Sequence, residues 1–258
     1  MSESRLSARQ DEAQAAPDGR AIAAQRLIGL GLAALIVGSW LALHVAAVFR
    51  LDPAAMPLAA AATIILVQTW LSVGLFIVAH DAMHGSLAPF WPGVNRWVGR
   101  VALLFYAGFS YDRLLPSHFA HHRHAGTAGD PDFDEAHPSA FLPWFANFMR
   151  RYVGWRELAA QTAISMTYLF VFGVAFANLL LFWALPALLA AVQLFYFGTY
   201  RPHRRDGEPF ADRHNSRSDD LPVWASLLTC FHFGYHHEHH DSPRTPWWRL
   251  PRYRRERG

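Results

Sequence analysis

The sequence predicts an all-α integral membrane protein, with about four transmembrane helices in two hairpins plus interfacial helices, and a histidine-rich site on the cytoplasmic side. Two observations lead to this fold class. Of the 258 residues, 52% are hydrophobic and only 17% are charged, a balance that favours a chain surrounded by lipid. Eight of the 15 histidines also fall into three short clusters, each beside a long apolar stretch.

The N-terminal segment, residues 1–20, is predicted to be a disordered tail, because it is rich in Ser, Ala, Gln, Asp and Arg and has no apolar period. Residues 21–258 are expected to form a single domain. The first apolar run is not followed by a small-residue cleavage site and a soluble domain, so we expect no cleavable secretory signal.

Two apolar runs, residues 27–48 and 58–79, are each long enough for one crossing, which takes ~20 residues for a ~30 Å hydrocarbon core. Lipid offers backbone groups no hydrogen-bond partners, so each run is expected to be helical. The short connection between them contains Pro53 and Pro57. These features predict a helical hairpin.

The stretch of residues 162–200 carries no charged side chain and is about twice as long as one crossing. It predicts a second hairpin, interrupted by Asn178 and Pro186, whose outer turn the sequence does not locate. The run of residues 97–109 is shorter and carries Arg100. It is therefore expected to be a re-entrant or interfacial helix.

All 23 basic residues are arginines, and the formal net charge is +3. Arg50 alone lies in the segment that joins the first two runs, whereas the others lie in the tail, the central segment and the C-terminal segment. By the positive-inside rule, these three regions share the cytoplasmic side, together with both termini. Arginines that flank apolar runs are better explained by topology and anionic headgroups than by a nucleic-acid partner.

The three histidine clusters have helical spacing, and residues three or four apart share one face of a helix. Four crossings bring all three clusters to the same cytoplasmic face. Eight converging imidazoles are enough for two metal ions. The clusters consist of His80 and His84, of His118, His121 and His122, and of His236, His239 and His240.

The chemistry of these clusters favours iron. The single cysteine, Cys230, excludes a disulfide framework and thiolate-rich iron–sulfur or zinc sites. Imidazole alone suits iron, zinc or copper, and oxygen activation favours iron among them. Spacing and composition thus indicate a membrane di-metal oxygenase that acts on a lipophilic molecule. A membrane metal carrier is the non-enzymatic alternative, but its ligands should line the crossing path, where only His44 is expected.

Metal-bound imidazoles usually donate their second N–H to a carboxylate or carbonyl. Asp81 is the preferred candidate, and Asp112, Asp130, Asp132 and Glu238 are others. A group of aromatic residues is equally well explained as the lining of an apolar channel or as a belt at the membrane interface. These are Phe105, Tyr106, Phe109, Tyr111, Phe195, Tyr196 and Phe197.

The chain resembles the bacterial β-carotene ketolases (carotenoid 4,4'-ketolases or oxygenases), within the superfamily of membrane fatty-acid desaturases and hydroxylases. The histidine clusters by themselves indicate the superfamily, and the later segments indicate the ketolases. The resemblance is carried by residues 80–86, 118–122, 126–133, 196–203, 213–218, 227–240 and 246–248.

The resemblance implies a non-haem di-iron enzyme of the bacterial cytoplasmic (inner) membrane. It implies O2 as co-substrate, electrons from a ferredoxin-type donor and its reductase, and a carotenoid that arrives from the lipid phase. Two successive hydroxylations and loss of water would introduce 4-keto groups, converting β-carotene to echinenone and then canthaxanthin. Whether zeaxanthin is converted to astaxanthin is left open. The alternative is a di-iron desaturase or hydroxylase that acts on an acyl lipid or another carotenoid position.

In this resemblance the iron ligands are the eight clustered histidines and a ninth outside them. His203 is assigned as the ninth, because the Tyr200-Arg201-Pro202-His203 segment is similar to a tyrosine-x-x-histidine of membrane alkane hydroxylases. His214 and His232 are its rivals. No side chain is assigned as a general base.

Overall fold

The computed structural model describes residues 18–207 and 209–257, which form helices joined by turns and contain no strand. The predicted all-helical class is confirmed. Residues 1–17 of the predicted tail lie outside the described residues. The first described helix begins at Gly19, because the carboxylate of Asp18 caps it by accepting a hydrogen bond from the Arg20 backbone N–H at 2.9 Å.

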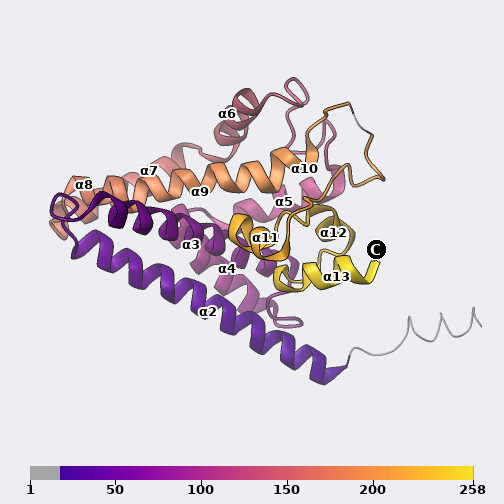
Figure 1. Cartoon of the computed structure of the whole chain (residues 1–258), viewed down its shortest axis with the longest axis horizontal. Helices are drawn as coiled ribbons and strands as arrows, with labels where there is room; N and C mark the ends of the chain where they lie inside the picture. The colour runs from indigo at the N-terminus through magenta and orange to yellow at the C-terminus, as the bar shows by residue number, and fades with distance from the viewer. Residues whose placement is uncertain (1–17, 208, 258) are drawn as a thin grey trace, which may run out of the picture.

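Helices α2 (Gly19–Phe49) and α3 (Leu58–His84) form the first hairpin and run side by side along the molecule (Figure 1). The indole N–H of Trp40 donates to the Ser72 hydroxyl at 2.9 Å and links the two helices. Both helices extend beyond the predicted apolar runs. In particular, α3 continues through His84, so the first histidine cluster lies on the last turns of this helix and not after it.

The second hairpin begins with α7 (Trp155–Met166) and the π-helical η1 (Thr167–Val171). The outer turn occupies residues 172–175, with Gly173 at a φ of 66°. The returning arm is one continuous helix from Phe176 to His203. Its parts are α8 (Phe176–Leu179), η2 (Leu180–Ala184), α9 (Leu185–Phe195), η3 (Tyr196–Tyr200) and α10 (Arg201–His203).

Neither Asn178 nor Pro186 interrupts this returning helix. Pro186 is the second residue of α9, just after the π-helical turn η2, and such a turn accommodates a residue that has no N–H to donate. The side-chain amide of Asn178 donates to the carbonyls of Ala47, Val48 and Leu51 at 2.7–3.2 Å. It thereby fastens the second hairpin to the end of α2.

Within residues 18–207 and 209–257, three helices are long and apolar enough to cross a membrane, namely α2, α3 and the continuous helix from Phe176 to His203. The remaining arm, α7 with η1, is shorter and has Arg156 and Glu157 in its first turn. Large apolar side chains lie exposed on these elements, among them Leu27, Leu58, Leu66, Phe170 and Phe176. Water would disfavour such a surface and lipid would not, so the fold is that of a membrane protein.

Helix α4 (Pro92–Ala107) covers the run expected to be re-entrant or interfacial, and it packs against α3. Its exposed Arg96 and Arg100 both bind the carboxylate of Asp112, and it ends at Gly108 with a φ of 69°.

The other helices surround the end of the bundle that carries the histidines. They are α5 (Tyr111–His124), α6 (Phe141–Tyr152), α11 (Val223–Cys230), α12 (His236–Asp241), the 3-10 helix η4 (Trp247–Arg249) and α13 (Leu250–Arg257).

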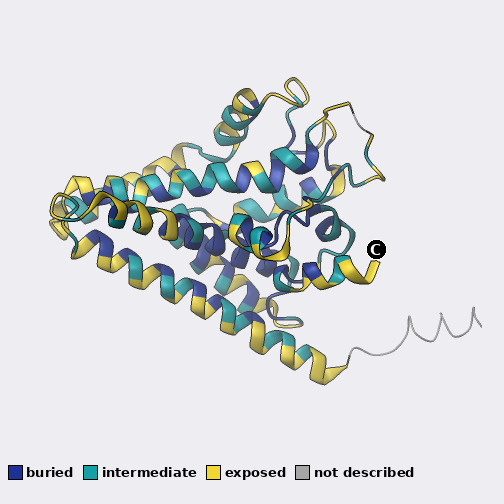
Figure 2. Ribbon diagram, in the orientation of Figure 1, coloured by how far each residue is buried: buried dark blue, intermediate teal, exposed yellow. Residues whose placement is uncertain are grey.

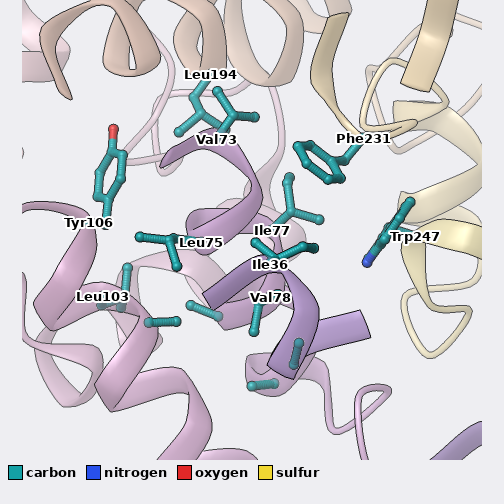
Figure 3. Close-up of a cluster of buried hydrophobic side chains, with 14 of the residues drawn as sticks. Ile36, Val73, Leu75, Ile77, Val78, Leu103, Tyr106, Leu194, Phe231 and Trp247 are labelled. Atoms are coloured by element: carbon teal, nitrogen blue, oxygen red, sulfur yellow. The ribbon is translucent and has the colours of Figure 1, made fainter. Parts of the chain in front are cut away.

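The main hydrophobic core surrounds α3, whose second half is buried nearly throughout (Figure 2). Ile36 from α2, Leu103 from α4 and Phe231 after α11 pack around it (Figure 3). At Gly74 a Cβ atom would lie 2.8 Å from the Phe231 ring and 2.9 Å from Ile36, so only glycine allows this approach. A helix enclosed in this way holds the histidines at its end in a fixed position.

Candidate metal centre

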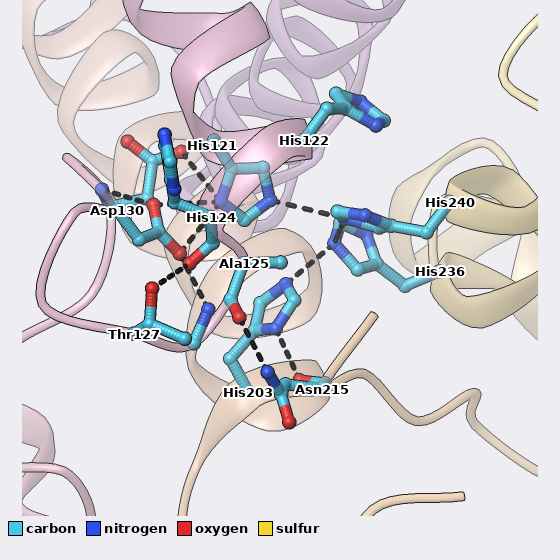
Figure 4. A network of polar contacts seen from close by, with 12 residues as sticks. His121, His122, His124, Ala125, Thr127, Asp130, His203, Asn215, His236 and His240 are labelled. Carbon is cyan, nitrogen blue, oxygen red and sulfur yellow. Dashed lines mark hydrogen bonds and ion pairs between the residues drawn. The ribbon is translucent and has the colours of Figure 1, made fainter. Parts of the chain in front are cut away.

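Four elements carry the nine histidines that the sequence analysis selected, and most of these side chains are buried. The last two turns of α3 present the first pair, α5 presents three and the short helix α12 presents three. His203 ends the continuous helix of the second hairpin. Figure 4 shows how side chains from three of these elements, α5, α10 and α12, converge.

The nine imidazoles form two groups, and within each group the candidate ligand atoms lie within 4.8 Å of one another. The two groups are neighbours, because the rings of His122 and His240 stack with centroids 4.4 Å apart. The first group consists of His80, His84, His118, His122 and His239, and the second of His121, His203, His236 and His240. His203 thus joins histidines from two clusters.

Facing Nε2 atoms within the groups lie close enough together to bind one ion. They are 2.6 Å apart in His84 and His118 and 3.1 Å apart in His122 and His239. In the second group, His203 to His236 measures 2.9 Å and His121 to His240 measures 3.1 Å. Neighbouring nitrogens that bind one ion at ~2.1 Å at right angles are separated by about 3.0 Å. Nε2 of His80 is buried without a hydrogen-bond partner, as a metal-directed lone pair would be.

Two oxygen acceptors orient rings of the second group. The Asp130 carboxylate lies 2.9 and 3.0 Å from Nδ1 of His121, and the Asn215 carbonyl lies 2.7 Å from Nδ1 of His203. When Nδ1 carries the proton, the Nε2 lone pair of each ring points into the group. The sequence analysis included Asp130 among its candidates but missed the Asn215 carbonyl, whose only sequence signal is its place in segment 213–218.

Asp81, the carboxylate preferred from the sequence, does not orient a histidine by a hydrogen bond. Its Oδ1 lies 3.9 Å from Nδ1 of His80, and its Oδ2 accepts the Trp247 backbone N–H at 3.2 Å. The physical reason is that consecutive residues of a helix point about 100° apart, so the neighbour of a histidine faces another part of the protein.

The other candidate carboxylates serve different contacts. Asp112 binds the two arginines of α4, and Glu238 lies against Ser218 and Arg254. Asp132 lies 3.8 Å from Nδ1 of His121 and accepts a hydrogen bond from the Tyr152 hydroxyl. Burial, partly offset by His121, raises the pKa of Asp132 to about 6.

The electrostatics of the site favour neutral imidazoles. Burial, reinforced by neighbouring histidines, lowers the pKa of His118, His236, His239 and His240, and it lowers the pKa of His122 to about 3. A neutral imidazole offers the lone pair that a metal ion requires. At His121 burial also opposes the charged form, but the Asp130 carboxylate outweighs it and raises the pKa.

Among the other histidines, His44, His137, His214 and His232 lie outside the two groups. The ring of His232 stacks on Tyr235, and the partly buried His214 lies with its ring centroid 6.0 Å from that of His240. His44 is buried on α2, where its Nε2 lies 3.0 Å from the Tyr168 hydroxyl. His137 is paired with Asp134 at 3.1 Å.

A cavity of about 430 Å³ adjoins both groups. Histidines of both groups line it, namely His80, His118, His122 and His239 of the first and His121 and His236 of the second. Its remaining wall is mostly apolar. Of the aromatic residues that the sequence analysis considered, Tyr106 and Phe109 line this cavity, whereas Phe105, Tyr111, Phe195, Tyr196 and Phe197 do not.

The residues present fit a pair of metal ions. Each group offers at least four imidazole donors at compatible separations, and the donor set contains no thiolate. An all-imidazole set suits a redox-active first-row metal, and the adjoining apolar cavity can hold a lipophilic molecule against it. The arrangement can therefore support oxidation of an apolar substrate.

Comparisons with known proteins agree with this chemistry. Residues 53–164 and 135–257 match the family model described as fatty acid desaturase. The chain is 49% identical to the β-carotene ketolase of Paracoccus sp. (strain PC1), over 90% of this chain and 94% of that protein. It is 52% identical to the β-carotene ketolase of Paracoccus sp. (strain N81106), over 84% and 88%. A sphingolipid delta(4)-desaturase of Pongo abelii is 31% identical over 70% of this chain and 59% of that protein.

Proposed function

The chain belongs to the fatty acid desaturase family, and from its similarity to β-carotene ketolases we propose that it is a β-carotene 4-ketolase, an O2-dependent oxidoreductase. The observation that carries the proposal is the combination of about 50% identity over most of the chain with an apolar cavity that ends at the histidine groups. The product is a ketone at the ring methylene beside the ring double bond. The alternative of an acyl-lipid desaturase or hydroxylase is not favoured, because its representative is more distant.

Ketone formation at one methylene proceeds by two successive hydroxylations, after which the geminal diol loses water. The allylic position weakens the C–H bond that must be broken. Apart from binding the metals, the protein has to hold the ring against the histidine groups and keep water away. Met83, Leu194 and Phe233, which line the cavity, supply apolar surface for both tasks.

We assign the metals as two irons of the non-haem kind typical of the family. The group of five histidines would hold one iron and the group of four, including His203, the other. When bound, the irons would supply an O2-derived oxidant strong enough to take a hydrogen atom from carbon. Asp130 contributes indirectly, because it keeps the His121 ring oriented with its Nε2 towards the site.

The proposed topology has four crossings, with α7 and η1 as the third. Both termini and the histidines then lie on the cytoplasmic side of a bacterial inner membrane, where a ferredoxin-type donor and its reductase would deliver electrons. Two features support it. The start of α2, the end of α10 and helices α12 and α13 lie at one end of the molecule (Figure 1), and arginines concentrate in the segments at that end.

The test is pigment analysis of a β-carotene-producing bacterium that expresses this chain. Extracts are separated by chromatography and identified by mass and absorption. Echinenone and canthaxanthin are the expected products. Unchanged β-carotene, from cells in which the protein is in the membrane, loaded with iron and supplied with reductant, would contradict the proposal.

A further inference from the structure

The cavity extends far beyond the reaction site. At one end its wall includes Thr199, one turn before His203, and at the other end it includes Phe176, beside the outer turn of the second hairpin. These two residues lie on the same continuous helix, at a separation of about 35 Å for a rise of 1.5 Å per residue. The cavity therefore runs along most of the length of the bundle.

This cavity is accessible from the lipid side. Met166 on α7, Leu180 on η2 and Leu188 on α9 all line it, yet 44%, 49% and 53% of their surfaces are exposed. A cavity whose apolar wall is partly open on the membrane-facing arms of a hairpin admits a hydrophobic molecule sideways, without passage through water.

The far end of the cavity has a well-supported wall. Trp183, which lines it, packs against Tyr168 with ring centroids 5.5 Å apart and against His44 at 6.3 Å. The Tyr168 hydroxyl and Nε2 of His44 are 3.0 Å apart, so this aromatic cluster is fixed by a hydrogen bond. Leu179 beside it is buried. The end wall is thus preformed and apolar on its cavity side.

We propose that one end of the cavity is a subsite for the substrate ring that is not being oxidised, an inference that rests on the proposed function. Four residues form this end: Leu169, Phe176, Leu180 and Trp183. β-Carotene is a rigid rod with identical rings at its two ends, and its length is close to the ~30 Å of the hydrocarbon core. When one ring lies at the histidines, the other lies about one molecular length away. The cavity, whose wall is mostly apolar, extends to that place, and this subsite makes the length of the polyene a determinant of binding.

The decisive variant is Ala184→Phe. Ala184 lines the cavity about 22 Å along the helix from Thr199, so a benzyl group there obstructs the path to the distal subsite and leaves the reaction end unchanged. Leu180→Trp, closer to the distal end, is a second obstruction. Ala177→Phe is the matched control, because Ala177 is exposed on the same helix and does not line the cavity.

The measurement compares β-carotene with a truncated polyene that has one β-ring and ends before the obstruction. Binding to the purified protein is followed by the induced circular dichroism of the polyene, and ketone formation is assayed in parallel. Because an added benzyl group overpacks the path, we expect about tenfold weaker binding of β-carotene by Ala184→Phe, a loss of about 1.4 kcal/mol. Binding and turnover of the truncated polyene should stay at the levels of the unmodified chain and of Ala177→Phe.

Equal weakening for both polyenes, or for neither, in the two obstructed variants would overturn the subsite. Retained binding of the truncated polyene shows in the same experiment that each variant is folded. Because binding is measured separately from ketone formation, length-dependent binding without any ketone would contradict the proposed function alone, and ketone formation without length dependence would contradict the subsite alone.

Discussion

Asp130 and His121 form a buried pair in which both carboxylate oxygens face Nδ1 of the imidazole, at 2.9 and 3.0 Å. The carboxylate is held independently of the histidine, because it also accepts the backbone N–H groups of Gly126 and Asp132 at 2.8 Å. The loop after α5 thus forms a rigid acceptor that turns Nε2 of His121 towards the group of four histidines.

Asp130→Asn tests this orientation. An amide either accepts one weaker hydrogen bond or presents its NH2 to the ring, which favours the wrong tautomer of His121. Loss of such a partner typically costs 10–100-fold in metal affinity or activity. We expect reduced iron per chain and reduced ketone formation, measured by metal analysis and chromatography. Asp134→Asn, which changes a carboxylate that contacts Asn147 and His137, should leave both near their original levels.

His203 is predicted to be the ninth ligand, and single substitutions separate it from its rivals. His203→Ala removes one of four donors from its group, so we expect it to lose bound iron and ketone formation. His214→Ala and His232→Ala remove rings outside both groups and should retain iron. Iron per purified chain is the measurement. A full iron content in His203→Ala, or its loss in either rival, would reassign the ligand.

The contact between Gly198 and Phe233 supports the site from the second hairpin. A Cβ atom at Gly198 would lie 2.4 Å from Cε1 of Phe233, whose ring packs on His80 and His236 at 4.7 and 5.1 Å. Gly198→Ala should therefore push this ring against the histidines and lower the free energy of unfolding by about 1–3 kcal/mol. Thermal unfolding in detergent measures the change. Gly38→Ala on α2, where nothing lies within 4 Å, is the matched control and should not destabilise.

The sequence predicted the helical class and the two hairpins well, because crossing a membrane requires long apolar runs. It misplaced their ends, since hydropathy stops at polar residues while a helix continues to its cap. Thus α2 begins at Gly19 after the Asp18 cap, and α3 continues to His84 before the left-handed Gly85. The outer turn at residues 172–175 was not located because every residue around it is apolar or small.

Histidine spacing predicted which side chains gather but not which neighbours orient them. Residues at helical spacing share a face whatever the tertiary fold, so the three histidine clusters could be identified from the sequence alone. Asp130 lies in the loop after α5, and the turns of that loop bring its carboxylate to His121. The backbone N–H of Trp247, which is 166 residues away in the sequence, donates a hydrogen bond to Asp81. Contacts of this kind depend on tertiary packing, which local spacing does not encode.

The four-crossing topology can be tested by cysteine labelling, because the one native cysteine, Cys230, is buried. Three exposed positions are each replaced by cysteine. Ala55 lies in the connection between α2 and α3, and Ala175 lies in the outer turn of the second hairpin. Arg213 lies in the segment after α10, and the variants are Ala55→Cys, Ala175→Cys and Arg213→Cys. The positive-inside rule places the first two outside and the third inside. A membrane-impermeant maleimide should label the first two in intact spheroplasts and Arg213→Cys only after permeabilisation, while the unmodified chain stays unlabelled. Labelling of Ala175→Cys only after permeabilisation would mean that the second hairpin does not cross, and would leave α2 and α3 as the sole spanning pair.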